Sequence, residues 1–167
     1  MNSRDINAMY VRNVVFGVED SLVSTVGLLS GIAAAGVPRG TVFLTGTVLI
    51  FVEAFSMAVG SFLSERSVEE YERASVASGR NSLIAGSVMF FSYFLSGFVP
   101  LLPYFFTEVR AAFWSSIFLS LIALFLLGLV SGRMFKADGW KSALRTFFVG
   151  GIAVAVGVLV GQFLKVG

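Results

Sequence analysis

The chain has 167 residues, of which 56% are hydrophobic and 13% are charged, and it contains no cysteine and no histidine. This composition excludes a soluble globular domain, which needs far more polar surface, and it excludes disulfides, thiolate chemistry and imidazole catalysis. The net charge of +2 does not indicate a nucleic-acid partner, because the basic residues stand at the ends of apolar runs rather than in a cluster.

Five long apolar runs follow one another along the chain, each close to the ~20 residues that a helix needs to cross a bilayer. They predict an all-α integral membrane protein with one transmembrane domain over residues 1–167. The first run is too long for a cleavable signal peptide and contains Glu19 and Asp20, so we expect it to be retained. The predicted helices cover residues 14–36, 41–64, 82–106, 111–132 and 142–164.

The distribution of Lys and Arg predicts the orientation of these helices. Nine of the twelve stand in the amino-terminal tail and in the second and fourth connections, and three stand on the opposite side. By the positive-inside rule the amino terminus is cytoplasmic and the carboxyl terminus is outside. The three on the opposite side are Arg39, Arg110 and Lys165.

Three acidic residues lie inside the first two runs: Glu19, Asp20 and Glu53. An acid at the centre of a membrane helix costs roughly 2.5 to 3.5 kcal/mol on insertion scales, and no Lys or Arg lies deep in any run to neutralise these. Such residues must be protonated, face water or bind a cation. A cation site would account for all three.

Antiparallel packing of the first two helices predicts that Asp20 and Met57 are level, with Glu53 one turn deeper than Met57 on the same face. Two carboxylates and a thioether suit Fe²⁺ or Mn²⁺, because a thioether favours a softer ion than Ca²⁺ or Mg²⁺. The alternative for Met57 is that it only fills a gap in the core.

Other residues of the first run have competing explanations. Gly27 and Gly31 continue the face of Asp20, and small residues at this spacing are typical of close helix packing. Glu19 points about 100° away from Asp20, so it either binds the metal or pairs with Arg12 at the membrane surface.

A short acidic extension, residues 65–80, continues the second helix into the cytoplasm. It places Glu65, Glu69 and Glu72 on one face, where they could collect metal ions at the entrance. The alternative is a solvated helix stabilised by pairs at i and i+4, namely Arg66 with Glu70 and Glu69 with Arg73.

Sequence motifs in all five runs resemble those of the vacuolar iron transporter family, in the same order. The first run has VFGVEDSLVST at 15–25 and the second has SMAVG at 56–60. The later runs have GFVPLLP at 97–103, LFLLG at 124–128 and GGIA at 150–153. The resemblance therefore covers nearly the whole chain.

This resemblance implies a five-helix protomer, a two-fold homodimer with the path between subunits, and export of Fe²⁺ or related ions from the cytosol in exchange for protons. It also implies that Asp20 and Met57 match the intramembrane metal ligands of the family. Two departures stand out. The long glutamate-rich domain after the second helix is absent, and Ser61 stands where members commonly have Glu, whereas Glu53 stands where they have a small residue.

We therefore expect a transporter of Fe²⁺ or Mn²⁺ in which protons and metal compete for Asp20 and Glu53, with no prosthetic group, in a prokaryotic plasma membrane. One alternative is a membrane scaffold without transport. Another is an exporter of organic cations, bound by Glu53 and an aromatic group. An enzyme is not expected, because no nucleophile, base and orienting group stand together. The aromatic group would be Phe90, Phe91, Tyr93 and Phe94.

Overall fold

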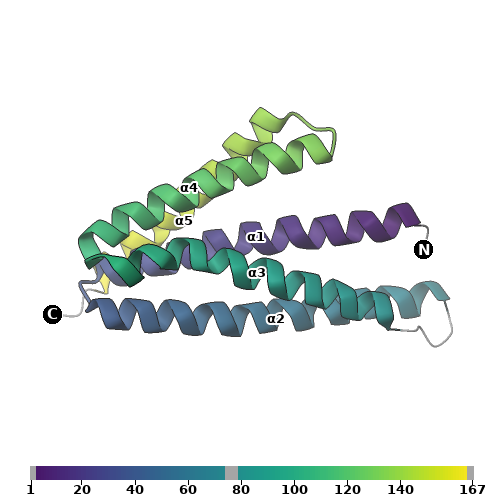
Figure 1. The fold of residues 1–167 in the computed structure, drawn as a ribbon, viewed down its shortest axis with the longest axis horizontal. Helices are drawn as coiled ribbons and strands as arrows, with labels where there is room; N and C mark the ends of the chain where they lie inside the picture. Colours follow the sequence, from purple (N-terminus) through teal and green to yellow (C-terminus); the bar gives the residue numbers. More distant parts are fainter. Residues whose placement is uncertain (1–2, 74–78, 165–167) are drawn as a thin grey trace.

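The computed structural model describes residues 3–73 and 79–164, except for the side chains of residues 3–7 and 72–73. The described residues form five helices and no strands (Figure 1), which confirms the predicted all-α class. All five helices are long and apolar enough to cross a membrane. The helices are α1 (Ser3–Ala34), α2 (Arg39–Arg73), α3 (Arg80–Phe106), α4 (Val109–Met134) and α5 (Gly139–Phe163).

The connections have the turn chemistry that their residues predict. Gly36, with φ of +83°, ends α1 in the left-handed conformation that glycine adopts without strain. Pro38 then precedes α2 and its carbonyl accepts from the amide of Thr41 over 2.9 Å. Asp138 caps α5 by accepting from the amides of Trp140 and Lys141. Each turn is short, so consecutive helices are antiparallel neighbours.

Two helices differ in length from the prediction. Helix α1 begins at Ser3, well before residue 14, because nothing in residues 3–13 breaks a helix. Helix α2 continues through the predicted acidic extension as far as Arg73, supported by a 2.7 Å ion pair between Arg66 and Glu70. Residues 74–78 of that extension lie outside the described residues, and Gly79 and Arg80 belong to the start of α3.

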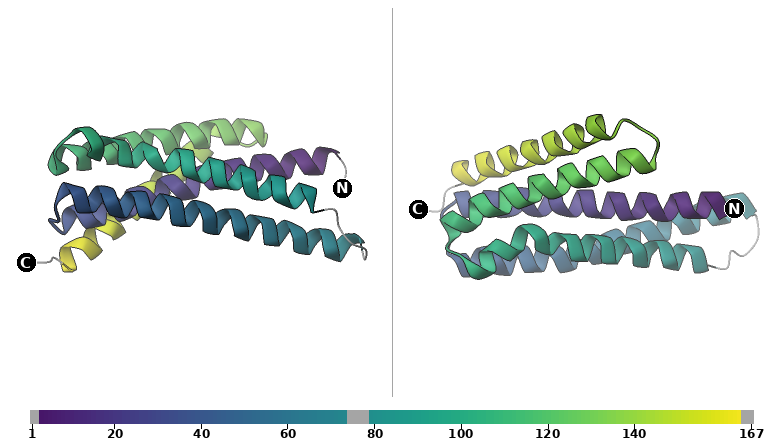
Figure 2. Two further views of the ribbon diagram at one scale, coloured as in Figure 1. Left: turned by 60° about the horizontal axis from the view of Figure 1, so that its bottom comes forward. Right: turned by 45° about the horizontal axis from the view of Figure 1, so that its top comes forward.

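Helix α1 lies between two hairpins, one made of α2 and α3 and the other of α4 and α5 (Figures 1 and 2). It packs extensively on α3 and α5 and only sparsely on α2. The main apolar core lies towards the α1–α2 turn, where the ends of α1 and α3 meet the starts of α2 and α4. The other half of the α1–α2 boundary is therefore less tightly filled. The core consists of Leu29, Val42, Ile50, Leu101, Tyr104 and Ala112.

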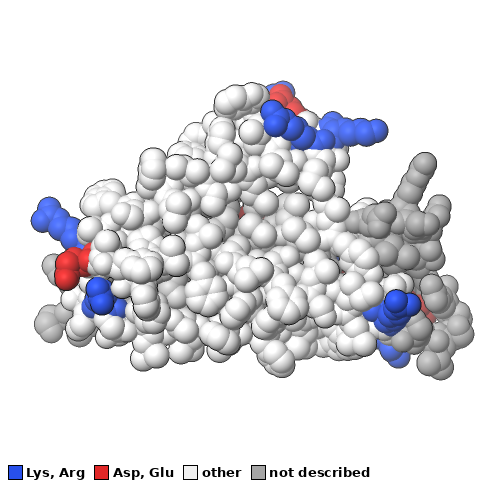
Figure 3. All heavy atoms as spheres, viewed as in Figure 1, with Lys and Arg blue, Asp and Glu red and all other residues white. Residues whose placement is uncertain are grey.

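Charged side chains gather at the ends of the bundle, and the surface between them is almost free of charge in the view of Figure 3. Large apolar side chains are exposed along this middle zone, among them Phe55 and Phe118, which are 67% and 68% exposed. A surface of this kind is stable in lipid and would aggregate in water. The protein is therefore a multi-pass membrane protein.

Candidate metal site

The register of α1 against α2 is defined by a hydrogen bond from Asn13 Nδ2 to Ser61 Oγ over 3.1 Å. Because the helices are antiparallel, a step of seven residues from Asn13 reaches Asp20, and the same step back from Ser61 ends beside Glu53. Glu53 is thus level with Asp20. The sequence predicts that Met57 is level with Asp20. In the structure Met57 lies about one helical turn away from that level, towards the end of the bundle where α1 begins.

Asp20 and Glu53 form an acid pair in the middle of the bundle. Both side chains are half-buried, and the register places them level with each other on neighbouring helices. The three ion pairs formed by the described residues involve neither of them. Two carboxyl groups in a membrane interior repel each other unless a proton or a cation compensates them. The pair therefore has the electrostatics of a cation site.

A cavity of about 420 Å³ opens next to this pair, towards the amino-terminal end of the bundle. It lies between α1 and α2 and is closed at the back by α3. We call it the Met57 cavity. Its walls carry oxygen, amide and thioether groups, which are ligands for borderline divalent ions. The polar and sulfur-bearing side chains in its lining are Arg12, Asn13, Ser56, Met57, Ser61, Ser64, Glu65 and Met89.

On the other side of the acid pair lies a group of buried hydroxyls. The Ser24 and Tyr93 hydroxyls are 2.7 Å apart, and Ser21 Oγ donates to the Tyr93 carbonyl over 2.7 Å. Tyr93 is fully buried, and its hydroxyl contacts Ser24, about one helical turn from Asp20 on α1. These bonds hold α1 against α3 and place neutral polar groups directly beyond the acids.

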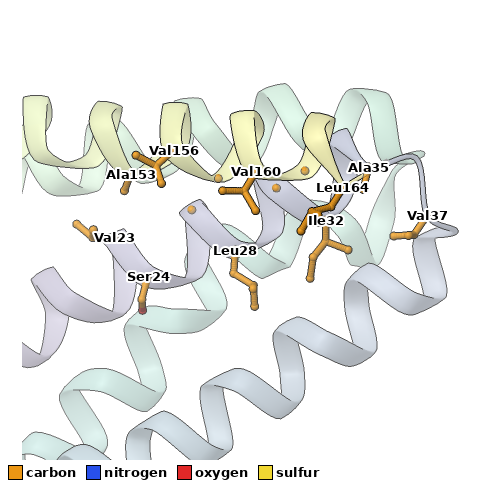
Figure 4. A pocket seen from close by; sticks show the side chains of 14 residues that line it. Val23, Ser24, Leu28, Ile32, Ala35, Val37, Ala153, Val156, Val160 and Leu164 are labelled. Atoms are coloured by element: carbon orange, nitrogen blue, oxygen red, sulfur yellow. The ribbon is translucent and has the colours of Figure 1, made fainter. Parts of the chain in front are cut away.

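Ser24 also borders a second cavity, of about 680 Å³, between α1 and α5 (Figure 4). In the close-up, Ser24 lies at one end of the lining, while Val37 and Leu164 lie towards the other end. We call this the α1–α5 cavity. Along α1, Asp20 therefore lies about one turn after Phe16, which lines the Met57 cavity, and about one turn before Ser24, which borders the α1–α5 cavity.

The glycines on α1 pack against α5 as predicted. A Cβ at Gly27 would lie 3.2 Å from the Ala153 carbonyl oxygen, and one at Gly31 would lie 2.7 Å from the Gly157 carbonyl oxygen. Only small residues permit this approach of two backbones. Their role is therefore helix packing.

The remaining predicted site residues are spread along the helices. Arg12 pairs with Glu65 over 2.6 Å, and not with Glu19, which is half-buried. Glu65 lines the mouth of the Met57 cavity. Glu69 is buried and accepts a hydrogen bond from Ser82 Oγ over 3.2 Å, so it is not part of a solvated face. The side chain of Glu72 lies outside the described residues.

Among the described residues no three acidic side chains come together as a metal-binding group, so Glu19 does not join Asp20 and Glu53 in one cluster. The cavity instead contains a residue that sequence reasoning missed, the thioether of Met89 on α3. A methionine in the middle of an apolar run was its only signal. Tyr93 was assigned to an aromatic group, whereas its hydroxyl contacts Ser24.

Comparison with known proteins gives a consistent result. The family model described as the VIT family matches residues 11–84 and 76–162. Vacuolar iron transporter homolog 2 of Arabidopsis thaliana is 31% identical, covering 89% of this chain and 81% of the relative. Vacuolar iron transporter 1 of the same plant is 22% identical, covering 93% and 86%. Vacuolar iron transporter 1 of Tulipa gesneriana is 23% identical, covering 87% and 83%.

The two matched segments overlap at residues 76–84, which reach from the α2–α3 connection into the start of α3, where the sequence lacks the long insertion expected of the family. The alignment with the second of these relatives runs over 215 residues although the chain has 167, so that relative contains additional residues. The matches nevertheless cover both hairpins and α1. This chain belongs to the VIT family.

Proposed function

We propose that this protein exports Fe²⁺ or Mn²⁺ from the cytosol in exchange for protons. The observation that carries the proposal is the acid pair, Asp20 and Glu53, which has no basic partner among the described residues and whose Asp20 lies on α1 between residues that line two cavities. A permanent basic partner would hold both carboxyl groups in one protonation state. Without one, the carboxyl groups are available to exchange protons for metal. The names of the relatives, which are iron transporters or their homologs, support the same substrate.

The transport cycle follows from this competition. A metal ion that enters the Met57 cavity meets Met57 first and then displaces protons from Asp20 and Glu53. Rearrangement of the helices closes the cavity and opens the far side, where incoming protons release the metal. The hydroxyls of Ser24 and Tyr93 stand next on that route, and neutral oxygens can replace water around an ion without trapping it.

The proposal includes an orientation, a membrane and an oligomer. The excess of Lys and Arg favours a cytoplasmic amino terminus, which makes the Met57 cavity the cytosolic entrance. A prokaryotic plasma membrane remains the expected location. A two-fold homodimer is expected from the resemblance to the family, and a second copy would bring another Asp20 and Glu53 to the path between subunits.

Export of organic cations is less well supported, because the aromatic group is engaged elsewhere. The rings of Phe90 and Phe94 stack with centroids 5.5 Å apart, and Phe94 packs edge-on against Phe51 at 5.0 Å. Phe91 is 59% exposed on the lipid side. Tyr93 contacts Ser24, about one turn from Asp20, and one ring does not form a cation cage.

The test is ion flux in proteoliposomes that contain the purified protein, with Fe²⁺, Mn²⁺, Co²⁺, Zn²⁺, Ca²⁺ and Mg²⁺ tested with and without a pH gradient. We expect flux of Fe²⁺ or Mn²⁺ coupled to protons. Asp20→Asn or Met57→Ala should reduce it by about tenfold or more, as loss of a metal-site group usually does. Glu108→Gln, in an exposed acid beyond the end of α3, is the matched control.

The outcomes separate the candidate functions. Full proton-coupled flux in Asp20→Asn would contradict the proposed exchange of protons for metal at this carboxyl group. Absence of flux for every ion in the wild type would contradict the transporter itself and favour the scaffold. Competition between a lipophilic organic cation and Fe²⁺ would favour the organic-cation exporter.

A further inference from the structure

The Met57 cavity also contains Met89, a thioether that has no role in the proposed transport cycle. It stands in the middle of α3 and is only 3% exposed. It lines the same cavity as Met57, which belongs to α2. The chain has five methionines, and two of them thus face one small space beside the acid pair.

The position of the Met89 sulfur is determined by a glycine on α1. A Cβ at Gly17 would lie 3.1 Å from Met89 Sδ and 3.0 Å from Ser92 Cβ. The sulfur therefore rests against the bare backbone of α1, less than one helical turn from Asp20. A larger residue at position 17 would push Met89 away from α1.

We propose that Met89 is a second thioether ligand at the Met57 cavity, so that Fe²⁺ and softer divalent ions are bound in preference to Mn²⁺. The inference rests on the proposed function and deepens it. Thioethers contribute little to the binding of hard cations, so each added sulfur shifts the preference of a site towards softer ions. Two sulfurs from different helices that line one cavity can bind the same ion.

An oxygen ligand is available in the same cavity. Asn13 is buried, and the two hydrogen bonds that it makes to described residues, to Ser61 and to the Ala85 carbonyl, are both donated by Nδ2. Its Oδ1 therefore keeps its lone pairs for a cation. Together with Met57 and Met89 it makes an uncharged entrance site. Such a site binds the ion weakly enough for the ion to move on to the charged pair.

Simple packing explains Met89 less well. Methionine is a common gap filler in membrane bundles, and it adapts its shape to close voids. Here about 420 Å³ remains open beside it. A residue selected only for packing would have filled part of that space.

The first test compares ions in proteoliposomes. Met89→Leu nearly conserves volume and removes the sulfur. We expect it to raise the KM for Fe²⁺ about tenfold, at the low end of the effect of losing a metal-site group, and to leave the KM for Mn²⁺ unchanged. Met134→Leu, in an exposed methionine on α4, is the matched control. Equal losses for both ions, or no loss for either, would overturn the proposal.

The second test does not depend on transport. Cd²⁺ is added to the purified full chain in detergent, and X-ray absorption counts its sulfur neighbours. We expect two in the wild type, one in Met89→Leu, one in Met57→Leu and none in the double variant. A count that Met89→Leu leaves unchanged would overturn the role of Met89. A wild type that binds Cd²⁺ through two sulfurs but moves no ion would contradict only the proposed transport.

Discussion

At the scale of single residues, the proposed exchange of metal for protons depends on two carboxyl groups. Asp20 and Glu53 are level with each other on facing helices, half-buried and without a basic partner among the described residues. Acids that served only packing would be replaced by apolar residues at lower cost in a membrane. Their neighbours, the hydroxyls of Ser24 and Tyr93, are polar but uncharged. In the proposed cycle, protons and metal would therefore set the net charge of the site.

Glycines make the second contribution at this scale, because they set how closely α1 and α5 approach. A Cβ at Gly157 would collide with the backbone carbonyl of Gly27. We expect Gly157→Ala to destabilise the protein by about 1–3 kcal/mol, the usual cost of overpacking. The measurement is the melting temperature in detergent.

The control for this substitution lies on the same helix. A Cβ at Gly151 would meet nothing within 4 Å. Gly151→Ala should keep or slightly raise the melting temperature, because alanine favours helix over glycine by about 0.5–1 kcal/mol. Equal melting temperatures for the two variants would show that the α1–α5 approach is looser than described.

At the scale of helices, the boundary between α1 and α2 differs from the others. These helices carry the acid pair, yet they pack sparsely on each other. Near the amino-terminal end they are joined by the Arg12–Glu65 ion pair and by the bond between Asn13 and Ser61. A boundary held by a few polar contacts can rearrange at a lower cost than one filled with apolar side chains. We therefore expect a conformational change during transport to occur at the boundary between α1 and α2.

The Arg12–Glu65 pair allows a direct measurement of that link. Glu65 is 10% exposed and Arg12 is 66% exposed, so the pair is partly screened by solvent. We expect a coupling energy of about 1 kcal/mol from a double-mutant cycle of Arg12→Gln and Glu65→Gln, followed by unfolding in detergent. The exposed pair Arg66–Glu70, treated in the same way, is the control and should give less. Strictly additive effects at Arg12 and Glu65 would mean that the pair does not hold the helices together.

At the scale of the whole molecule, charged and apolar side chains occupy different positions along the helix bundle. On the surface seen in Figure 3, charged side chains gather at the two ends. Large apolar side chains are exposed between them, and the main core lies towards the α1–α2 turn. The Met57 cavity lies towards the other end. Helix α1, between the two hairpins, borders both this cavity and the α1–α5 cavity. One helix therefore provides a continuous wall along the proposed path.

The orientation of this molecule is a prediction that labelling can test. The chain has no cysteine, so each single cysteine variant reports one position. Ser67 is exposed on α2 beyond the predicted membrane span, and Thr107 is exposed in the α3–α4 connection at the opposite end. With a cytoplasmic amino terminus, an impermeant thiol reagent added to intact cells should label Thr107→Cys and spare Ser67→Cys. The reverse pattern would contradict the orientation and make the Met57 cavity the exit.

The position of each helix could be predicted from sequence because burial in lipid demands a long, continuous apolar segment, and Gly and Pro mark where it ends. Polar extensions were harder to delimit. Residues 3–13 carry no apolar run, yet they belong to α1, since a helix continues until a residue breaks it. Glu65 and Glu69 were placed on an exposed face, whereas contacts with Arg12 and Ser82 bury them.

The sequence by itself determined that the protein spans the membrane five times, belongs to this family by its motifs and carries acids where lipid does not tolerate them, because each follows from local composition and spacing. Only the tertiary structure decided that Glu53 is level with Asp20, that Met57 lies one turn away, that Met89 lines the Met57 cavity and that Tyr93 contacts Ser24. The reason is physical: register between helices depends on side-chain contacts made across the bundle, such as those of Asn13 and Gly17, which no spacing along a single helix encodes.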